Sequence, residues 1–351
     1  MIKKRKIGKT NLEITELSMG TAQIGGWPKE VNNKEAFETL DFAWKKGIRY
    51  FDTAPLYGSG MAETRLGNFL KEKNRDDFVI ATKVGRLVVD TDVPNDKFKG
   101  QDPHKDTIFD FSYDGVMKSF EESLNRLKLN HIDVLHLHDP DNYPHHLDEA
   151  RKGAIKAMIK LKDQKLVKAL GCGLNQNEML IELSKEGCFD CFLLAGRYTL
   201  LDQSSLDELI PICKTNNISL VLGGVFNSGI LINPSSNSYF DYTKLDVNWF
   251  ENAKMHLVRI PKDFESADYW LKKAYKLKDA CKKSNIPLKK AALQFPFANE
   301  IVATTILGMG SIKEVEENYN NYINKIPYSF WKKIKDEGLI DMRSPIDFFN
   351  S

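Results

Sequence analysis

The stretch FDTAPLYG at residues 51–58 follows a short apolar run, and it places an aspartate at the end of that run and a tyrosine five residues later. Two other apolar runs end in ionisable residues, Lys83 and His138. Apolar runs without alternation are typical of parallel strands that are covered on both faces. If these strands form a barrel, the residues at their carboxyl ends converge on one mouth. The sequence therefore predicts a barrel with a polar site at its rim.

Short apolar runs alternate with helical patterns about eight times along the chain, which is typical of βαβ units around a parallel sheet. The predicted strands are Glu16–Thr21, Tyr50–Thr53, Phe78–Lys83, Asp133–His138, Val167–Gly173, Cys191–Ala195, Leu220–Gly224 and Ala303–Leu307. The length of 351 residues suits a single barrel. We therefore expect one α/β domain over residues 1–351, a (β/α)8 TIM barrel closed at its base by an N-terminal β-hairpin.

Amphipathic helices separate the predicted strands. Ala36, Leu40 and Trp44 share one helical face, and a second helix is predicted after a cap at Ser112. Two longer insertions, Gly85–Phe111 and Asn233–Ala267, follow the third and seventh strands. Both are predicted as long loops on the carboxyl rim of the barrel, where such folds keep their sites. Together with Trp27 and the C-terminal tail, they are expected to form the substrate pocket.

The composition excludes several classes of protein. Fifty basic and 48 acidic side chains give a net charge of +2, which provides no strong field for nucleic acid. The run KKRK at residues 3–6 is therefore interpreted as a solvated face of the hairpin. No apolar stretch suits a signal peptide or a membrane span, so a cytoplasmic protein without a membrane partner is expected.

Five cysteines are an odd number in a long chain and indicate a reducing compartment rather than a disulfide framework. Cys188 and Cys191 form a lone CxxC pair. Without a second pair it is a weak zinc signal, and we expect buried thiols there instead.

The residues at the strand ends suit acid–base chemistry. A lysine ammonium stabilises a tyrosine phenolate and lowers its pKa, while a carboxylate holds the ammonium in place. Asp52, Tyr57 and Lys83 would form such a set, and His138 could donate a hydrogen bond to a carbonyl oxygen. None of these groups is a strong nucleophile or a two-electron carrier, so a hydride must come from a cofactor.

Two alternatives remain open at this point. His136 and His138 lie on the same side of their predicted strand, as in metal-dependent barrel hydrolases. No third histidine or carboxylate-rich strand end supports a metal, and His136 is expected to be a packed, hydrogen-bonded neighbour. The other alternative is a catalytically idle module that binds NAD(P) as a regulatory signal.

The pattern DTAxxYG at 52–58, with Lys83 and His138, resembles the catalytic tetrad of the aldo/keto reductases, which are NAD(P)-dependent barrel oxidoreductases. The motifs TKVGR, HDPD, GGVFNSGIL and IPYSFWKKIKDEGLI extend the likeness over nearly the whole chain. They resemble the branch that contains D-threo-aldose 1-dehydrogenase, L-fucose dehydrogenase, L-galactose dehydrogenase and pyridoxal 4-dehydrogenase.

This resemblance implies a role for each residue of the tetrad. Tyr57 would donate or accept the proton, Lys83 would lower its pKa, Asp52 would pair with Lys83, and His138 would orient the substrate oxygen. The branch implies a small-molecule substrate, a sugar or another carbonyl or alcohol. The expected reaction is oxidation of an aldose of the L-fucose or D-threo-aldose type at C1 to its lactone. The resemblance leaves the direction of the reaction and the oligomeric state open, and it implies no metal.

The resemblance also places the cofactor. The matching positions are Gly20, Thr21, Asn175, Phe226, Asn227, Ser228, Gly308, Gly310, Ser311, Glu314 and Asn318. Ala195 and Gly223 depart from the family pattern where many members have a glutamine and a ring that stacks on the nicotinamide. Glu314 and Gly310 replace residues that are often basic, so NAD is favoured over NADP, although Lys313 lies close in sequence.

Overall fold

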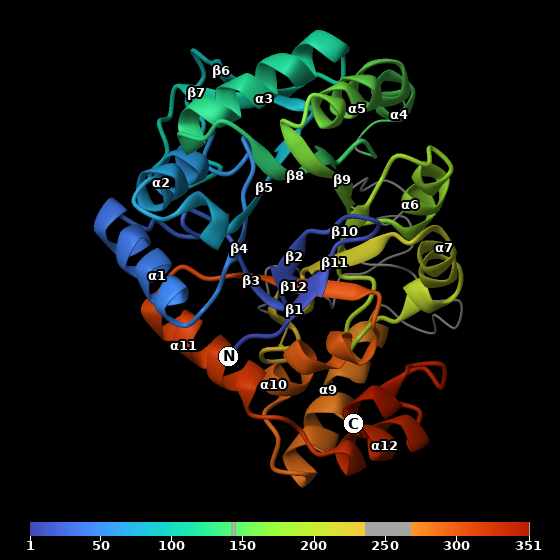
Figure 1. Cartoon of the computed structure of the whole chain (residues 1–351). Helices are drawn as coiled ribbons and strands as arrows, with labels where there is room; N and C mark the ends of the chain where they lie inside the picture. Colours follow the sequence, from blue (N-terminus) through green and yellow to red (C-terminus); the bar gives the residue numbers. More distant parts are fainter. Residues whose placement is uncertain (142, 144, 236–267, 351) are drawn as a thin grey trace.

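The computed structural model describes residues 1–141, 143, 145–235 and 268–350. Eight parallel strands form a closed barrel, and helices surround it as an outer ring (Figure 1). The predicted (β/α)8 fold is confirmed. In the barrel the order of neighbouring strands is β10-β11-β12-β3-β4-β5-β8-β9.

Each barrel strand begins and ends within one residue of its predicted bounds. The strands are β3 Leu17–Gly20, β4 Tyr50–Asp52, β5 Val79–Val84, β8 Ile132–His138, β9 Val167–Leu174, β10 Cys191–Ala195, β11 Ser219–Gly223 and β12 Val302–Gly308. This agreement follows from the continuous apolar character of strands that are buried on both faces, which is a strong local signal.

The helices follow the predicted amphipathic patterns. Their bounds are α1 Asn33–Lys45, α2 Met61–Leu70, α3 Tyr113–Leu127, α4 His146–Glu149, α5 Ile155–Asp163, α6 Asn177–Ser184, α7 Leu209–Asn216, α9 Tyr269–Lys283, α10 Leu288–Gln294, α11 Ile312–Ile323 and α12 Tyr328–Asp336. Asn32 and Glu35 form a capping box at the start of α1. The Ser112 side chain accepts a hydrogen bond from the Gly115 amide and caps α3 as expected.

The N-terminal hairpin closes the base of the barrel. Its strands are β1 Lys4–Lys6 and β2 Glu13–Thr15. Ile7 and Ile14 are buried among inward-facing side chains from the lower ends of the barrel strands, and Figure 1 shows the hairpin across the centre of the ring. The predicted hairpin is confirmed.

One residue of the basic run at 3–6 does not belong to a solvated face. The exposed fraction of the Arg5 side chain is only 15%, and its Nε lies 2.6 Å from Glu16 Oε1. Its guanidinium also donates to three carbonyl oxygens in the segment 297–302. Our interpretation of the run holds for the exposed lysines but is wrong for Arg5. Its planar guanidinium ties the hairpin to the segment that leads into the start of β12.

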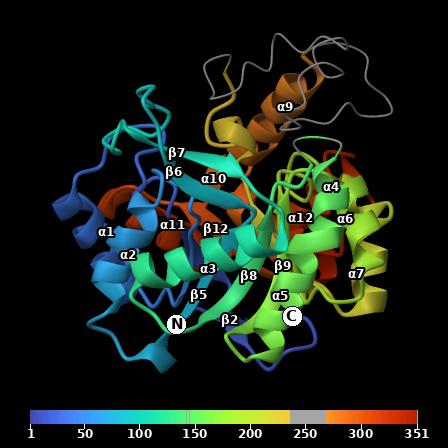
Figure 2. The same ribbon diagram turned by 90° about the horizontal axis from the view of Figure 1, so that it is seen from above.

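The first insertion contains regular structure that a loop prediction omits. Residues Arg86–Asp90 form β6 and Lys105–Phe109 form β7, and the two pair antiparallel. Figure 2 shows this ribbon at the end of the molecule opposite to the N-terminal hairpin. The Leu87-Val88-Val89 run explains it, because β-branched residues favour strands. Of the second insertion, residues 236–267 lie outside the described residues.

All five cysteines are free thiols. Cys191 is buried on the barrel interior, as expected, whereas Cys188 is half-buried. None of the helices in the described ranges combines the length and the apolar character needed to cross a membrane.

Candidate active site

The alternation of side chains along three neighbouring strands builds the site. In β4, Phe51 faces the helices whereas Tyr50 faces the interior, so Asp52 also points inward. In β5, Thr82 faces outward and donates to Glu63 of α2 at 2.6 Å. Ala81 joins the interior cluster, so Lys83 faces inward one layer higher. The interior is therefore apolar at its base and polar at its mouth.

Lys83 and Asp52 form a buried ion pair. Lys83 Nζ lies 2.6 Å from Asp52 Oδ1 and donates to the Thr53 carbonyl oxygen at 2.8 Å, and both side chains are almost fully buried. Burial lowers the pKa of Lys83, but Asp52 and Tyr57 together raise it above its ordinary value. The lysine is therefore an ammonium at neutral pH, and Asp52 holds it there.

Tyr57 lies over this pair, in the turn that follows β4. The Lys83 ammonium is 4.9 Å from the centroid of the Tyr57 ring. Burial raises the pKa of Tyr57, and the charge and hydrogen bond of Lys83 act in the opposite direction. The net pKa lies above its ordinary value, which differs from the lowered value that we expected. In the protein without cofactor, burial outweighs the ammonium, so Tyr57 is a neutral acid at neutral pH.

His138 meets the edge of Tyr57, with ring centroids 6.2 Å apart and ring planes at 87°. Burial, followed by the charges of Arg86 and Lys83, holds the pKa of His138 well below its ordinary value. The imidazole is therefore neutral. Its Nε2 lies 3.5 Å from Asp139 Oδ2, and a carboxylate at that distance favours the tautomer that carries its proton on Nε2.

Arg86 and Asp139 frame His138 and were not among the residues that we predicted. Arg86 Nη2 donates to Asp139 Oδ2 at 3.0 Å, and its guanidinium lies 3.9 Å from the centroid of the Phe109 ring. The motifs TKVGR and HDPD contain both residues. Arg86 comes three residues after the predicted strand end at Lys83, and Asp139 directly follows the one at His138. Opposite charges that follow two neighbouring strand ends were a signal for this pair.

An aromatic wall leads from the site to the surface. The Tyr57 ring lies 6.4 Å from that of Phe98, and Phe98 lies 5.9 Å from that of Trp27. Trp27 is 43% exposed, whereas Phe98 is buried. Phe98 belongs to the insertion after β5, and no local sequence pattern identifies it as a residue of the site. Trp27 thus lies beside the mouth, on the side where we predicted substrate contact.

His136 is fully buried one layer below His138. Both of its ring nitrogens are buried without a hydrogen-bond partner among the described residues. We expected a packed, hydrogen-bonded neighbour: His136 is packed, but the expected hydrogen bond is absent among the described residues. Burial lowers its pKa to about 3. Gly171 makes room for it, since a Cβ there would lie 2.3 Å from His136 Nδ1. Within the described ranges no third possible ligand joins His136 and His138.

The predicted cofactor segments follow neighbouring strands. Gly20 of β3 pairs in register with Gly308 of β12 on one side and with Asp52 of β4 on the other. β11 lies next to β12, so the turn that holds Phe226, Asn227 and Ser228 is at the same rim. Asn175 directly follows β9 on the far side of β8. The barrel order thus brings these positions to the mouth that holds the tetrad.

The start of α11 contains the remaining predicted positions. Ser311 caps the helix by accepting from the Glu314 amide. Glu314 Oε2 in turn accepts a hydrogen bond from the Gly310 amide at 2.7 Å. The Glu314 carboxylate therefore already accepts the hydrogen bond of a backbone amide at the helix N-terminus. A phosphate at this position would otherwise accept that hydrogen bond.

Buried polar atoms test whether a dinucleotide fits this rim. Thr21 Oγ1 and Asn318 Oδ1 are buried without a hydrogen-bond partner in the part of the chain that the structure describes. Asn227 uses its side-chain amide to donate to the Gly196 carbonyl oxygen at 3.2 Å. The residues fit a polar ligand, since the Thr21 hydroxyl after β3 and the Asn318 carbonyl oxygen in α11 are available for hydrogen bonds, and Asn227 fixes the turn after β11. Ala195 and Gly223, paired in register at the ends of β10 and β11, place no ring or amide there.

Comparisons with known proteins show the family and the fold of the chain. Residues 16–337 match the model of the aldo/keto reductase family. The chain is 35% identical to pyridoxal 4-dehydrogenase of Microbacterium luteolum, over 96% of this chain and 98% of that protein. It is 34% identical to D-threo-aldose 1-dehydrogenase of a Pseudomonas species, over 94% and 95%. An aldo-keto reductase structure from Bacillus halodurans superposes with a TM-score of 0.71 at 23% identity, covering 97% of both chains.

The fold and the tetrad define a barrel protein whose mouth holds an aspartate, a lysine, a tyrosine and a histidine, each next to the following one. This chain belongs to the aldo/keto reductase family. It is accordingly an oxidoreductase, and the family is consistent with a nicotinamide cofactor. The suspected branch is confirmed as well, since relatives from that branch align over nearly the full chain.

Proposed function

We propose that this protein is an NAD-dependent dehydrogenase that oxidises the cyclic hemiacetal of an aldose at C1 to a lactone. Two relatives at 34–35% identity are named for dehydrogenation of an aldose and of pyridoxal. Both names describe the oxidative direction on small polar compounds that carry an aldehyde carbon. An aldose of the L-fucose or D-threo type is the substrate class that this likeness favours.

The observation that carries the proposal is the contact set around Tyr57. Lys83 lies against its ring at 4.9 Å, His138 meets its edge at 6.2 Å, and Asp52 holds Lys83 at 2.6 Å. A phenol beside an ammonium can release and recover a proton, because the ammonium stabilises the phenolate. These contacts would place a proton-transfer group, a charge stabiliser and a hydrogen-bond donor around one carbon centre.

In the oxidative direction Tyr57 acts as the base. Its phenolate oxygen takes the proton of the C1 hydroxyl, while the C1 hydrogen leaves with its two electrons. A bound nicotinamide supplies the hydride acceptor. Neutral His138 can donate its Nε2 proton in a hydrogen bond to the same oxygen when the substrate competes with Asp139 for that proton. Lys83 stabilises the charge that moves between the substrate oxygen and the Tyr57 oxygen. The oxygen and carbon then form the carbonyl group of the lactone, and the reverse sequence is carbonyl reduction.

Glu314 supports NAD as the cofactor. Its carboxylate lies at the N-terminus of α11 and accepts from the Gly310 amide. A 2′-phosphate at this point would meet a negative charge and would lose that backbone donor, whereas a ribose hydroxyl can donate to a carboxylate. Lys313 is exposed, so its opposing charge is largely screened by solvent.

The test is an activity matrix. Purified protein is mixed with NAD or NADP and with L-fucose, L-galactose, D-arabinose or pyridoxal, and absorbance of the reduced nicotinamide is followed. We expect turnover of at least one aldose with NAD. The Tyr57→Phe variant should lose roughly 10²–10⁴ in kcat, while its affinity for NAD stays close to that of wild type. Cofactor binding without turnover of any alcohol or carbonyl would instead indicate the idle regulatory module.

A further inference from the structure

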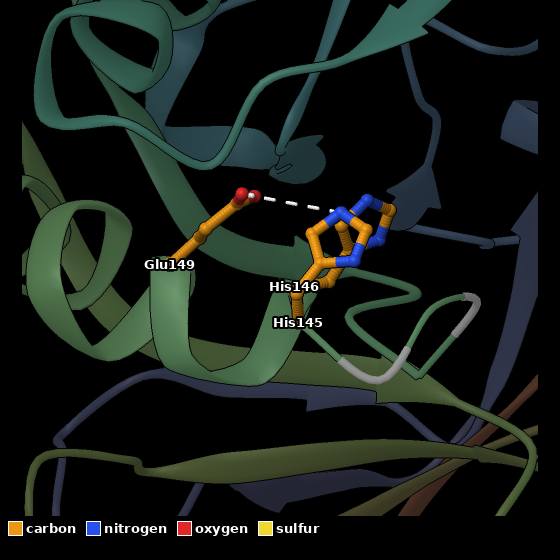
Figure 3. A group of neighbouring side chains, drawn as sticks. All are labelled: His145, His146 and Glu149. Carbon is orange, nitrogen blue, oxygen red and sulfur yellow. Dashed lines mark ion pairs between the residues drawn. The ribbon is translucent and has the colours of Figure 1, made fainter.

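A second cluster of ligating side chains lies on the connection between β8 and α5. His145, His146 and Glu149 each offer one ligand atom, and these atoms lie within 4.8 Å of one another. Figure 3 shows the two imidazoles side by side at the start of α4 and the Glu149 carboxylate pointing toward them. Among the described residues, these three side chains form the one group of histidine, cysteine or acidic residues whose arrangement could hold a metal ion.

Helical spacing explains how the sequence assembles the cluster. His145 caps α4 and Glu149 ends it, so the two residues are four positions apart and share a helical face. His145 Nε2 lies 3.9 Å from Glu149 Oε1. The two imidazole centroids are 4.7 Å apart, with ring planes at 77°. Two ligands at i and i+4 plus an adjacent third ligand form a compact chelating set.

The burial of His146 distinguishes this cluster from a chance surface group. Its ring packs against Phe109 at 4.6 Å and Phe111 at 4.9 Å, and the residue is only 5% exposed. Its Nδ1 is buried and has no hydrogen-bond partner in the described part of the chain. A polar nitrogen in an aromatic pocket is costly when unpaired. The pocket holds this imidazole in one orientation beside the other two groups.

We propose that His145, His146 and Glu149 bind a divalent transition-metal cation such as Zn²⁺. Two imidazole nitrogens and one carboxylate oxygen suit a borderline cation better than Ca²⁺ or Mg²⁺, which prefer oxygen ligands. Bond lengths near 2.0–2.1 Å place tetrahedral ligand atoms about 3.3 Å apart. The side chains of His145 and Glu149 are 63% and 52% exposed, so torsional rotation of these two can close the set around a metal. Water can fill the fourth position.

This site is separate from the proposed tetrad but lies near it. Phe109 contacts both sites: its ring centroid lies 4.6 Å from that of His146 and 3.9 Å from the Arg86 guanidinium. Arg86 pairs with Asp139. The proposal does not depend on the oxidoreductase reaction, and its test uses binding rather than turnover.

The experiment is a titration of tag-free, EDTA-treated and desalted full-length protein with ZnCl₂ by isothermal calorimetry. We expect a site of one-to-one stoichiometry whose affinity falls roughly tenfold or more in His145→Ala and in Glu149→Gln. Both residues are exposed, so these variants should fold. CoCl₂ should give the intense visible absorption of a low-symmetry, four-coordinate ion in wild type only.

His104→Ala is the matched control, because it removes a histidine from another exposed position and should bind Zn²⁺ like wild type. Zn²⁺ should also raise the melting temperature of wild type and of the control, but not that of the double variant His145→Ala/Glu149→Gln. Wild type that binds no Zn²⁺ at concentrations up to about 1 mM, or a double variant with unchanged Zn²⁺ affinity, would overturn the proposal.

Discussion

Replacing Lys83 by methionine tests the buried ion pair at the centre of the site. The variant keeps a side chain of similar length but removes the ammonium that lies 2.6 Å from Asp52 Oδ1. Asp52 Oδ2 already lacks a hydrogen-bond partner among the described residues, and the Asp52 side chain is only 3% exposed. Removing one partner of a buried pair costs about 3–5 kcal/mol, because it leaves an uncompensated charge.

The unfolding entropy, which scales with chain length, relates this loss of stability to a shift of the melting temperature. An unfolding entropy of about 2.1 cal/mol/K per residue over 351 residues gives about 0.74 kcal/mol/K. A loss of 3–5 kcal/mol therefore lowers the melting temperature by about 4–7 °C. Differential scanning calorimetry measures the shift, and reversibility on rescanning is required for this conversion.

The double variant Asp52→Asn/Lys83→Met is the control, since it replaces the ion pair by two neutral side chains of similar volume. Such replacements are often neutral for stability, so the double variant should recover most of the lost stability. Neither variant should recover turnover, because Tyr57 lacks its ammonium in both. The reasoning is refuted if Lys83→Met melts like wild type, or if the double variant is no more stable than Lys83→Met.

Three further predictions concern the proposed reaction. Because burial raises the pKa of Tyr57, the rate of alcohol oxidation should rise about tenfold per pH unit from neutral pH towards that pKa; a flat pH–rate profile measured with chemistry rate-limiting would contradict a Tyr57 base. Glu314→Gln should lower the ratio of kcat/KM with NAD to that with NADP by roughly tenfold, and an unchanged ratio would remove this carboxylate from cofactor selection. Asp139→Asn should weaken the Arg86 pair and reduce kcat by about tenfold or more without changing NAD affinity; wild-type kcat would show that His138 does not need this neighbour.

The sequence predicted the barrel and the tetrad for the same physical reason. Short apolar runs define the barrel strands, which are three to eight residues long. Period-two alternation decides which side chain at each strand end faces inward. Asp52, Lys83 and His138 therefore meet in the structure as their positions along the chain required. The segments at β3, β11 and β12 follow the same rule, because parallel strands bring their carboxyl ends to one rim.

Other features had no local signal. Phe98 comes next to Tyr57 only because the insertion after β5 folds back as a ribbon. The net pKa of Tyr57 depends on how much water the surrounding chain excludes, and this cannot be summed from its sequence neighbours. The unpaired ring of His136 likewise depends on the space beside Gly171, on another strand.

The sequence by itself determined the fold class, the strand ends and the residue types of the site, since these follow from local periodicity. Tertiary structure alone decided which distant side chains meet: Arg86 with Asp139, and His146 with Phe109. Contacts across tens of residues depend on the path of the insertions, and burial sets the charge state of the groups they enclose. Local sequence patterns predict neither these contacts nor these charge states, because both arise from packing between segments that are remote in sequence.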